Sequence, residues 1–229
     1  MPRDVGVVVV AAGRGERLGG QTAKQYQLIG GVPMVLRALR PFTSHPDVAQ
    51  VVLVLPPEDA QKPPSFLSGL SALTVVAGGE HRGDSVRAGL VVLRPECRVV
   101  LVHDAARPFA DQDVIGRVIA VARGGEGAVP AVPITDTLKE AAAGDPLRVA
   151  RTRPRANLWR AQTPQGFPRA ALEKAHAHAL RCGHRATDDA ALVEATGIPV
   201  RLVQDSARNL KVTTPEDLAL AELLAATLP

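Results

Sequence analysis

The sequence has little cysteine and few aromatic side chains, and each shortage narrows the class of protein it can encode. Among 229 residues there are two cysteines, Cys97 and Cys182, which lie far apart and form no CxxC pair. This spacing argues against a disulfide framework and against a zinc site, and it favours a buried thiol at both positions. Aromatic residues make up only 3%, so a stacking platform for single-stranded nucleic acid is not expected.

Long runs of one residue class are also missing. No apolar stretch reaches the roughly 18 residues that a membrane-spanning helix needs. The apolar start VGVVVVAAG is short and runs directly into charged residues, which is typical of a buried strand rather than a signal peptide. The formal net charge is +4, but Lys and Arg are dispersed, so small anionic substrates are favoured over nucleic acid. We therefore expect a cytoplasmic protein that binds neither a membrane nor nucleic acid.

Apolar residues are abundant, at 46% of the chain, and their order predicts an α/β fold. Segments that read as buried strands alternate with segments at helical spacing, so the sheet should be mostly parallel with helices on both faces. Strands are expected at 5–11, 51–55, 73–77, 99–102, 128–132, 200–203 and 210–212. Helices are expected to begin near Pro33, at Asp84 or Ser85, at Asp111, Arg169 and Asp189, and after the capping pattern TPED at 214–217.

The segment from about 134 to 157 breaks this alternation. Its sequence, ITDTLKEAAAGDPLRVARTRPR, is too polar for a core and too regular for a linker. We interpret it as a hairpin arm that projects from a single domain spanning 1–229. An exposed arm needs a surface to pack on, and a second copy of the chain is the expected partner, which would make the protein a homodimer.

The stretch AAGRGERLGGQTAKQ, at 11–25, follows the first predicted strand and is typical of a phosphate-binding loop. It is not a dinucleotide fingerprint, because Leu18 stands where GxGxxG requires its third glycine, and it does not match a Walker A loop. Its backbone N–H groups, with the cations of Arg17 and Lys24, suit phosphoryl or nucleotidyl transfer. The alternative is a solvated loop whose cations bind nothing.

A second polar segment, HDAARP, directly follows the strand predicted at 99–102. Asp104 in this segment could hold Mg²⁺ against phosphate oxygens, or it could serve only as a turn or cap residue. Arg107 could face the same ligand, whereas His103 is better explained as a tautomer fixed by backbone bonds. The loop at 11–25, Gly78-Gly79 and HDAARP all follow strands, so we expect them to meet at one edge of the sheet.

Seven motifs, taken in order, closely resemble the 2-C-methyl-D-erythritol 4-phosphate cytidylyltransferase family. They are AAGRGERLGGQTAKQ, GGEHRGDSV, VHDAARPF, DTLK, LWRAQTPQGF, TDDAALVE and NLKVTTPEDL, and the resemblance as a whole covers 5–221. The resemblance implies a Rossmann-like nucleotidyltransferase fold, a homodimer joined by hairpin arms, CTP as the donor and Mg²⁺ as the cofactor. It also implies the acceptor 2-C-methyl-D-erythritol 4-phosphate and a place in the non-mevalonate route to isoprenoid precursors.

The resemblance further implies a role for individual positions. Arg17 and Lys24 match the two cations that stabilise the transition state, and Asp104 matches the aspartate associated with the metal. The positions that match the CTP site are Ala11, Ala12, Gly13, Gly79, Glu80, Ser85 and Ala105. The positions that match the acceptor site are Arg107, Thr137, Arg155, Thr163, Thr187 and Lys211. The family often has Asp where Glu80 stands, which is harmless if that position acts through its backbone.

The motifs leave several alternatives open. The enzyme could act on another polyol phosphate such as ribitol 5-phosphate, because related cytidylyltransferases share many of the motifs. A non-catalytic nucleotide-binding protein is a second alternative, against which the combination of Arg17, Lys24 and Asp104 counts. Ser85 and Thr187 could each be only a helix cap. The sequence has no evident Ser/His/Asp or Cys/His constellation, which fits a reaction whose nucleophile is an anionic phosphate.

Overall fold

The computed structural model describes residues 3–13, 22–70 and 73–227. The strands are β1 (Val5–Val10), β2 (Leu28–Ile29), β3 (Val32–Pro33), β4 (Val48–Leu55), β5 (Leu73–Ala77), β6 (Val99–Asp104), β7 (Gly127–Pro133), β8 (Leu138–Ala142), β9 (Asp145–Arg153), β10 (Trp159–Ala161), β11 (Gln165–Pro168) and β12 (Val200–Gln204). The α-helices are α1 (Met34–Thr43), α2 (Pro57–Gln61), α3 (Arg82–Val91), α4 (Gln112–Arg123), α5 (Arg169–Cys182), α6 (Asp189–Glu194) and α7 (Pro215–Thr227). Short 3₁₀ turns lie at Lys24–Tyr26 and Ser65–Leu67.

Within the described residues, eight strands form one sheet in the order β10-β7-β11-β6-β1-β4-β5, with β12 also paired to β7. Parallel pairing joins β1 to β4 and β6, β4 to β5, and β12 to β7. The exceptions are β10 and β11, which run antiparallel to their neighbours. The sheet is therefore mixed and mostly parallel, as the alternation of the sequence predicted.

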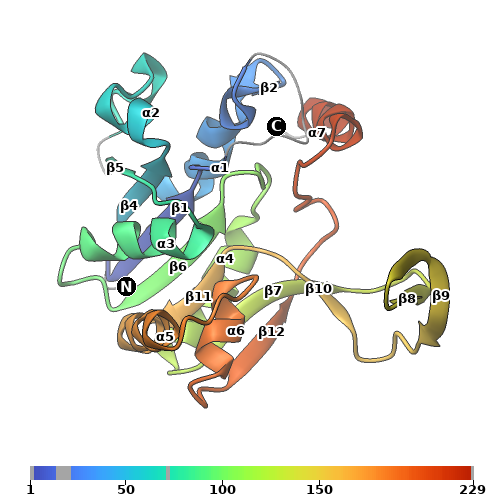
Figure 1. Ribbon diagram of the computed structural model, residues 1–229. Helices are drawn as coiled ribbons and strands as arrows, with labels where there is room; N and C mark the ends of the chain where they lie inside the picture. Colours follow the sequence, from blue (N-terminus) through green and yellow to red (C-terminus); the bar gives the residue numbers. More distant parts are fainter. Residues whose placement is uncertain (1–2, 14–21, 71–72, 228–229) are drawn as a thin grey trace.

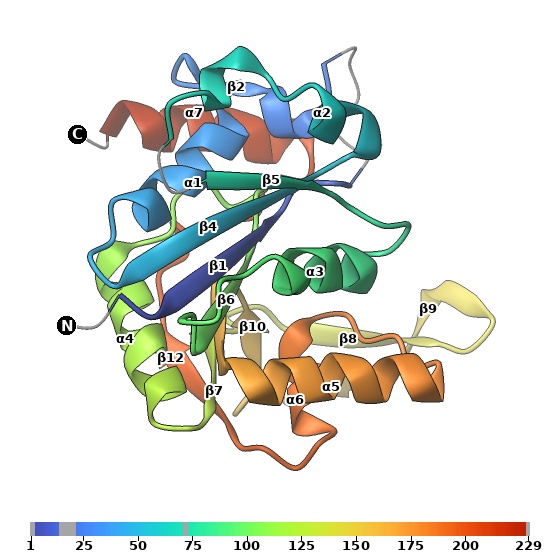
Figure 2. The ribbon, with the colours of Figure 1, turned by 90° about the vertical axis from the view of Figure 1, so that its left-hand side faces the viewer.

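Helices cover both faces of this sheet (Figure 1, Figure 2). On one face, Val7 and Val9 of β1 pack with apolar side chains of α1 and α4. On the other face, Val8 of the same strand packs with α3, α5 and α6. The unbroken apolar run of β1 follows from this arrangement, because successive side chains of a strand point to opposite faces and both faces are core.

The hairpin arm predicted near 134–157 is present. Strands β8 and β9 pair with each other in a separate two-stranded sheet, and the arm projects from the body of the molecule (Figure 1). All of β9 is exposed, including apolar Leu147 at 95% and Val149 at 56%. The described part of the chain therefore leaves both apolar side chains uncovered.

Several local predictions were wrong. Helix α3 begins at Arg82, and Asp84 lies within its first turn, where its carboxylate accepts from the backbone N–H of His81. No strand forms at 210–212, where the chain is irregular. Cys182 is exposed, whereas Cys97 is buried. Cys182 is the last residue of α5, and this end of the helix faces solvent.

The cap of the last helix was predicted correctly, whereas one strand of the sheet was not predicted. The capping pattern at the last helix is confirmed, because Thr214 Oγ1 accepts from Asp217 N and Thr214 N donates to the Asp217 carboxylate. Strand β11, inserted antiparallel between β6 and β7, was not predicted. Its four residues are too few to show a periodic pattern. None of the helices in the described part of the chain is long and apolar enough to cross a membrane.

Candidate active site

A cavity opens at the carboxyl ends of β1, β5 and β6. Its volume is about 290 Å³, close to the lower end of the range for small-molecule sites. Three segments line most of it, namely 10–13, 79–82 with Ser85, and 104–106. Lys24, Gln25, Met34 and Lys211 complete the lining. The prediction that the three strand-end segments meet at one edge of the sheet is confirmed.

Backbone contacts hold the three segments close together. Ala105 N donates to Val10 O at 3.1 Å. The end of β4 anchors the other two segments, since Ala11 N donates to Val54 O and Gly78 N donates to Leu55 O, both at 2.8 Å. The loop after β5 also approaches the first loop closely, because a Cβ on Gly78 would lie 2.5 Å from the Cβ of Ala12. Glycine is therefore required at this position for the two loops to touch. All seven residues predicted to bind the nucleotide line the cavity.

Ser85 and Glu80 occupy contrasting positions in this lining. Ser85 is 3% exposed, and its hydroxyl donates to His81 O at 3.3 Å. The interpretation of Ser85 as a cap is wrong, because the residue that precedes the helix is His81. The side chain of Glu80 is 87% exposed, which agrees with a position that acts through its backbone.

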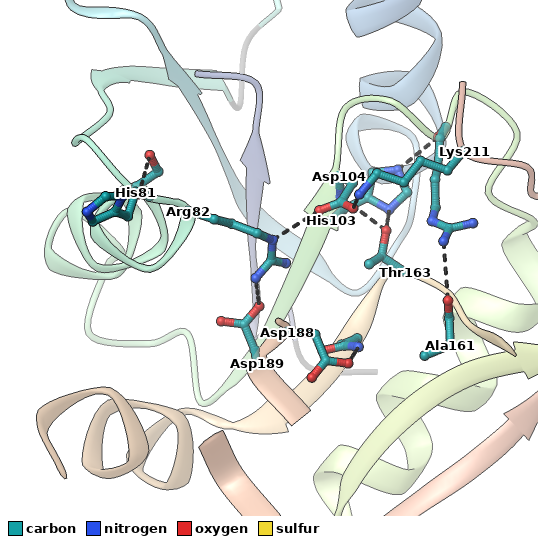
Figure 3. A network of polar contacts seen from close by, with 12 residues as sticks. His81, Arg82, His103, Asp104, Ala161, Thr163, Asp188, Asp189 and Lys211 are labelled. Atoms are coloured by element: carbon teal, nitrogen blue, oxygen red, sulfur yellow. Dashed lines mark hydrogen bonds and ion pairs between the residues drawn. The ribbon is translucent and has the colours of Figure 1, made fainter. Parts of the chain in front are cut away.

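Asp104 lies between two cations at the end of β6 (Figure 3). Its Oδ1 accepts from Arg82 Nε at 3.3 Å, and its Oδ2 accepts from Lys211 Nζ at 2.7 Å. Burial raises the pKa of the Asp104 carboxyl, but the charges of Arg82 and Lys211 outweigh burial and hold the pKa well below its usual range. Asp104 is therefore a carboxylate at neutral pH, with both oxygens directed at cations that line the cavity.

Arg82 is the charged residue of this site that sequence reasoning missed. Its guanidinium bridges two carboxylates, donating from Nε to Asp104 and from Nη1 to Asp189 at 2.7 Å. Asp189 is 1% exposed, and its other oxygen lies 2.8 Å from Nε2 of His176. Arg82 and Asp189 are 107 residues apart in the sequence, so no local pattern could have indicated the contact. The only available signal was an Arg directly after the Gly-Gly-Glu-His turn.

A second hydrogen-bond network, formed by Thr163, His103 and Arg107, holds the backbone of Asp104 in place. Thr163 Oγ1 accepts from Asp104 N at 3.1 Å and lies 3.0 Å from Nδ1 of His103. Nε2 of His103 lies 2.9 Å from Arg107 O. Burial lowers the pKa of His103 to about 4, so the ring is neutral at pH 7, with Nε2–H donating to Arg107 O and Nδ1 accepting from Thr163. The prediction of a tautomer fixed by backbone bonds is confirmed for Nε2 only, because the partner of Nδ1 is the side chain of Thr163.

Two residues predicted to bind the acceptor lie behind the cavity rather than in its lining. Arg107 is 9% exposed, and its guanidinium donates to Asn209 O at 2.6 Å and to Ala161 O at 3.3 Å. These bonds anchor the loop that carries Lys211. The Thr163 hydroxyl is engaged by Asp104 and His103. Their structural roles are clear, and their contact with an acceptor stays a prediction.

The remaining predicted residues lie in different places, some on the surface and two in the cavity lining. Thr137 and Arg155 are exposed at the base of the arm, where Arg155 Nη1 donates to Thr135 O. Thr187 is exposed and is not the cap of α6, because that role belongs to Asp188. Lys24 and Lys211 both line the cavity. Arg17 lies outside the described residues.

The fit of a magnesium ion depends on Asp104. In the described part of the chain there is no group of three or more His, Cys, Asp or Glu side chains that could hold a metal. A preformed all-protein metal site is therefore absent from these residues. Mg²⁺ at a nucleotide site usually takes one or two carboxylates and completes its shell with phosphate oxygens and water. The single carboxylate of Asp104 fits this second kind of site.

Comparison with known proteins identifies the relatives of this chain. The family model described as IspD, 2-C-methyl-D-erythritol 4-phosphate cytidylyltransferase, matches residues 5–226. The chain is 46% identical over 222 residues to the bifunctional enzyme IspD/IspF of Rhodospirillum rubrum, covering 96% of this chain and 56% of that protein. It is 43% identical over 235 residues to the 2-C-methyl-D-erythritol 4-phosphate cytidylyltransferase of Streptomyces coelicolor, covering 98% and 86%.

A solved structure shares the fold. The 2-C-methyl-D-erythritol 4-phosphate cytidylyltransferase of Thermus thermophilus matches with a TM-score of 0.81 at 38% identity, covering 97% of this chain and 99% of that one. The bifunctional relatives are longer, and this chain spans 56 to 58% of three of them.

Proposed function

The chain belongs to the 2-C-methyl-D-erythritol 4-phosphate cytidylyltransferase family, and we propose that it transfers CMP from CTP to 2-C-methyl-D-erythritol 4-phosphate. The products are 4-diphosphocytidyl-2-C-methyl-D-erythritol and pyrophosphate, in the non-mevalonate route to isoprenoid precursors. The observation that supports this proposal most strongly is the strand-end cavity, in which Lys24, Asp104 and Lys211 meet the backbone of the 10–13 segment. We also propose that the reaction takes place in the cytoplasm.

In the proposed reaction, an oxygen of the acceptor phosphate attacks the α-phosphorus of CTP. A new P–O bond forms, the bond between the α-phosphorus and the bridging oxygen breaks, and pyrophosphate leaves. The acceptor phosphate is anionic near neutral pH, so no strong general base is required. The work of the site is to bring two anions together and to stabilise the charge that develops between them.

We assign nucleotide binding, charge stabilisation, metal binding and acceptor binding to different residues. The backbone at 11–13 and 79–80, with Ser85 and Ala105, would hold the nucleotide. Lys24, together with Arg17, would stabilise charge on the α-phosphoryl group. Asp104 would hold Mg²⁺, which neutralises phosphate charge when bound. Lys211 would release Asp104 and bind the acceptor phosphate, because its side chain is 43% exposed and can turn.

The exposed arm points to a shared site. Thr137 and Arg155 are polar, exposed and at the base of an arm that leaves its own body. We propose that two copies of the chain exchange arms, so that these residues complete the acceptor site of the partner. Thr163, Thr187 and Arg107 would lie around the same acceptor.

Pyrophosphate release tests the proposed function. The chain is supplied with CTP and Mg²⁺ and with either 2-C-methyl-D-erythritol 4-phosphate or ribitol 5-phosphate, and a reaction without acceptor is the control. We expect release with the first acceptor alone. Release with ribitol 5-phosphate alone would keep the chemistry but change the acceptor. No release with either acceptor, from folded protein that binds CTP, would favour the nucleotide-binding alternative.

A further inference from the structure

We infer that Arg82 is a positioning residue for Asp104, and that the buried Asp189 fixes Arg82 in this role. This inference rests on the proposed function, because it takes Asp104 as the carboxylate that meets a nucleotide-bound Mg²⁺. It concerns residues to which neither the sequence patterns nor the proposed reaction gives a role. The two partners of the Asp104 carboxylate, Arg82 and Lys211, differ in how firmly they are held.

Lys211 is the exchangeable partner. It makes one bond to Oδ2 of Asp104, and its side chain is 43% exposed on an irregular segment after Asn209. Its ammonium can leave the carboxylate by rotation of its own side chain. An incoming phosphate would attract this ammonium, because a phosphate bears more negative charge than a carboxylate.

Arg82 is the fixed partner. Its Nε binds Oδ1 of Asp104, and its Nη1 binds a second carboxylate, Asp189, at 2.7 Å (Figure 3). Asp189 cannot follow a moving guanidinium, because it is 1% exposed and its other oxygen is held by the buried His176. A planar guanidinium that binds two carboxylates at once loses both bonds if it turns, so its orientation is set by the pair.

Because Lys211 can leave Asp104 and Arg82 cannot, the two oxygens of Asp104 have different roles. Oδ1 stays with Arg82, while Oδ2 becomes available when Lys211 leaves. Without Asp189, the guanidinium of Arg82 would be free to turn and to bind both oxygens of Asp104 through two N–H groups of one edge. Asp189 therefore keeps one oxygen of Asp104 accessible.

The test is the Mg²⁺ dependence of CTP binding, measured by calorimetry on the full chain without any acceptor. The variants are Arg82→Gln, Asp189→Asn and their combination. We expect each single variant to raise the Mg²⁺ concentration for half-maximal CTP binding by about tenfold or more, as for other partners that orient metal-binding carboxylates. The double variant should be no worse than Arg82→Gln, because Asp189 acts through Arg82.

A matched control lies on the same helix. Arg87 also pairs with an aspartate, Asp84, and its side chain is 31% exposed compared with 30% for Arg82. Arg87→Gln should therefore leave the Mg²⁺ dependence unchanged. A steady-state assay of Arg82→Gln should show a higher Mg²⁺ concentration for the half-maximal rate, whereas partial misfolding would lower the apparent kcat without moving that concentration.

Two outcomes would overturn the inference. One is a wild-type Mg²⁺ dependence in Arg82→Gln, and the other is a further loss of similar size when Asp189→Asn is added to that variant. If Asp189→Asn alone fails to fold, the comparison of Arg82→Gln with Arg87→Gln still decides. A chain that binds CTP with Mg²⁺ but releases no pyrophosphate would contradict the proposed function while leaving this test intact.

Discussion

Lys24 is the one cation among the described residues of the phosphate-binding loop at 11–25. It opens the short 3₁₀ turn at the end of that loop and lines the cavity. We predict that Lys24→Ala lowers kcat by about 100-fold or more, because one positioned donor to developing charge is lost. Steady-state kinetics would measure this change, and circular dichroism would check that the variant is folded.

Lys62 offers a control for this substitution. It is an exposed lysine at the end of α2 and does not line the cavity. Lys62→Ala should leave kcat unchanged. Near-normal turnover in Lys24→Ala would remove Lys24 from the transition state and leave the loop with a binding role only.

His103 gives a pH prediction at the same scale. Its pKa in the folded chain is about 4, below the usual 6.5, because the ring is buried. Between these two values the unfolded chain binds more protons than the folded one, so stability is complete above pH 6.5 and falls as the pH drops toward 4. The loss should be on the order of 3 kcal/mol, since each pKa unit corresponds to about 1.4 kcal/mol.

Chemical denaturation between about pH 7 and pH 4 would measure this loss. The variant His103→Gln should be less stable at neutral pH and should show a smaller loss over the same range. His178, exposed on α5, provides the control, since His178→Gln should keep the wild-type pH dependence. An equally steep loss in His103→Gln would assign the effect to other groups.

The sequence predicted single residues well where a local pattern marks them. Asp104 is the last residue of β6 and the 11–13 backbone directly follows β1, so the apolar pattern of these two strands was enough to assign both to the sheet edge. Arg82 could not be assigned in this way, because its partners Asp104 and Asp189 come from distant segments. Which residue caps α3 was also beyond the sequence, since Asp84 fits either the cap or the first turn.

Among whole elements, helix α3 depends on close packing against β1. A Cβ on Gly89 would lie 2.4 Å from Cγ1 of Val8, so any side chain there must push the helix away from the sheet. We predict that Gly89→Ala lowers the free energy of unfolding by about 1–3 kcal/mol through overpacking. Urea denaturation would measure the change.

Gly116, within α4, is the matched control for Gly89. Apart from its own helix backbone and chain neighbours, no atom of the described residues lies within 4 Å of the position that its Cβ would take. Gly116→Ala should raise the free energy of unfolding by about 0.5–1 kcal/mol, because alanine has the higher helix propensity. A destabilised Gly116→Ala with an unaffected Gly89→Ala would contradict this account of how α3 is seated.

The sequence predicted helices and strands best where their apolar segments are long and periodic. The strand predicted at 73–77 matches β5, and the long apolar strands β1, β4, β6 and β7 differ from their predicted bounds only at their ends. The segment at 210–212 has strand-like residues but forms no strand. Its backbone and side chains instead join the loop around Arg107 and Ala106, where Val212 N donates to Ala106 O. Such contacts are tertiary and leave no local pattern.

At the scale of the whole molecule, the proposed arm exchange predicts complementation between two inactive variants. Lys24→Ala damages the body of the site, and Arg155→Ala damages the arm. Mixing the two chains in equal amounts should restore about a quarter of wild-type activity, because half of randomly paired dimers are mixed and each holds one intact site. Pyrophosphate release after co-refolding would measure the recovery, and each variant alone is the control.

Complementation also separates the two placements of the arm. If each arm served its own body, both sites of a mixed dimer would be damaged and no activity would return. Deletion of the arm at 138–153 should in addition give a folded monomer without activity, with mass measured by light scattering. A fully active monomer would show that the arm has no part in the site.

The proposed reaction transfers a cytidylyl group to a polyol phosphate at this cavity. The most direct measurement is ³¹P NMR of the chain with CTP, Mg²⁺ and 2-C-methyl-D-erythritol 4-phosphate. We predict that the signals of CTP and of the acceptor phosphate fall together, while those of a new diphosphate diester and of pyrophosphate rise in equal amounts. Conversion of CTP to free CMP and pyrophosphate with the acceptor unchanged, or no change in CTP at all, would contradict the account.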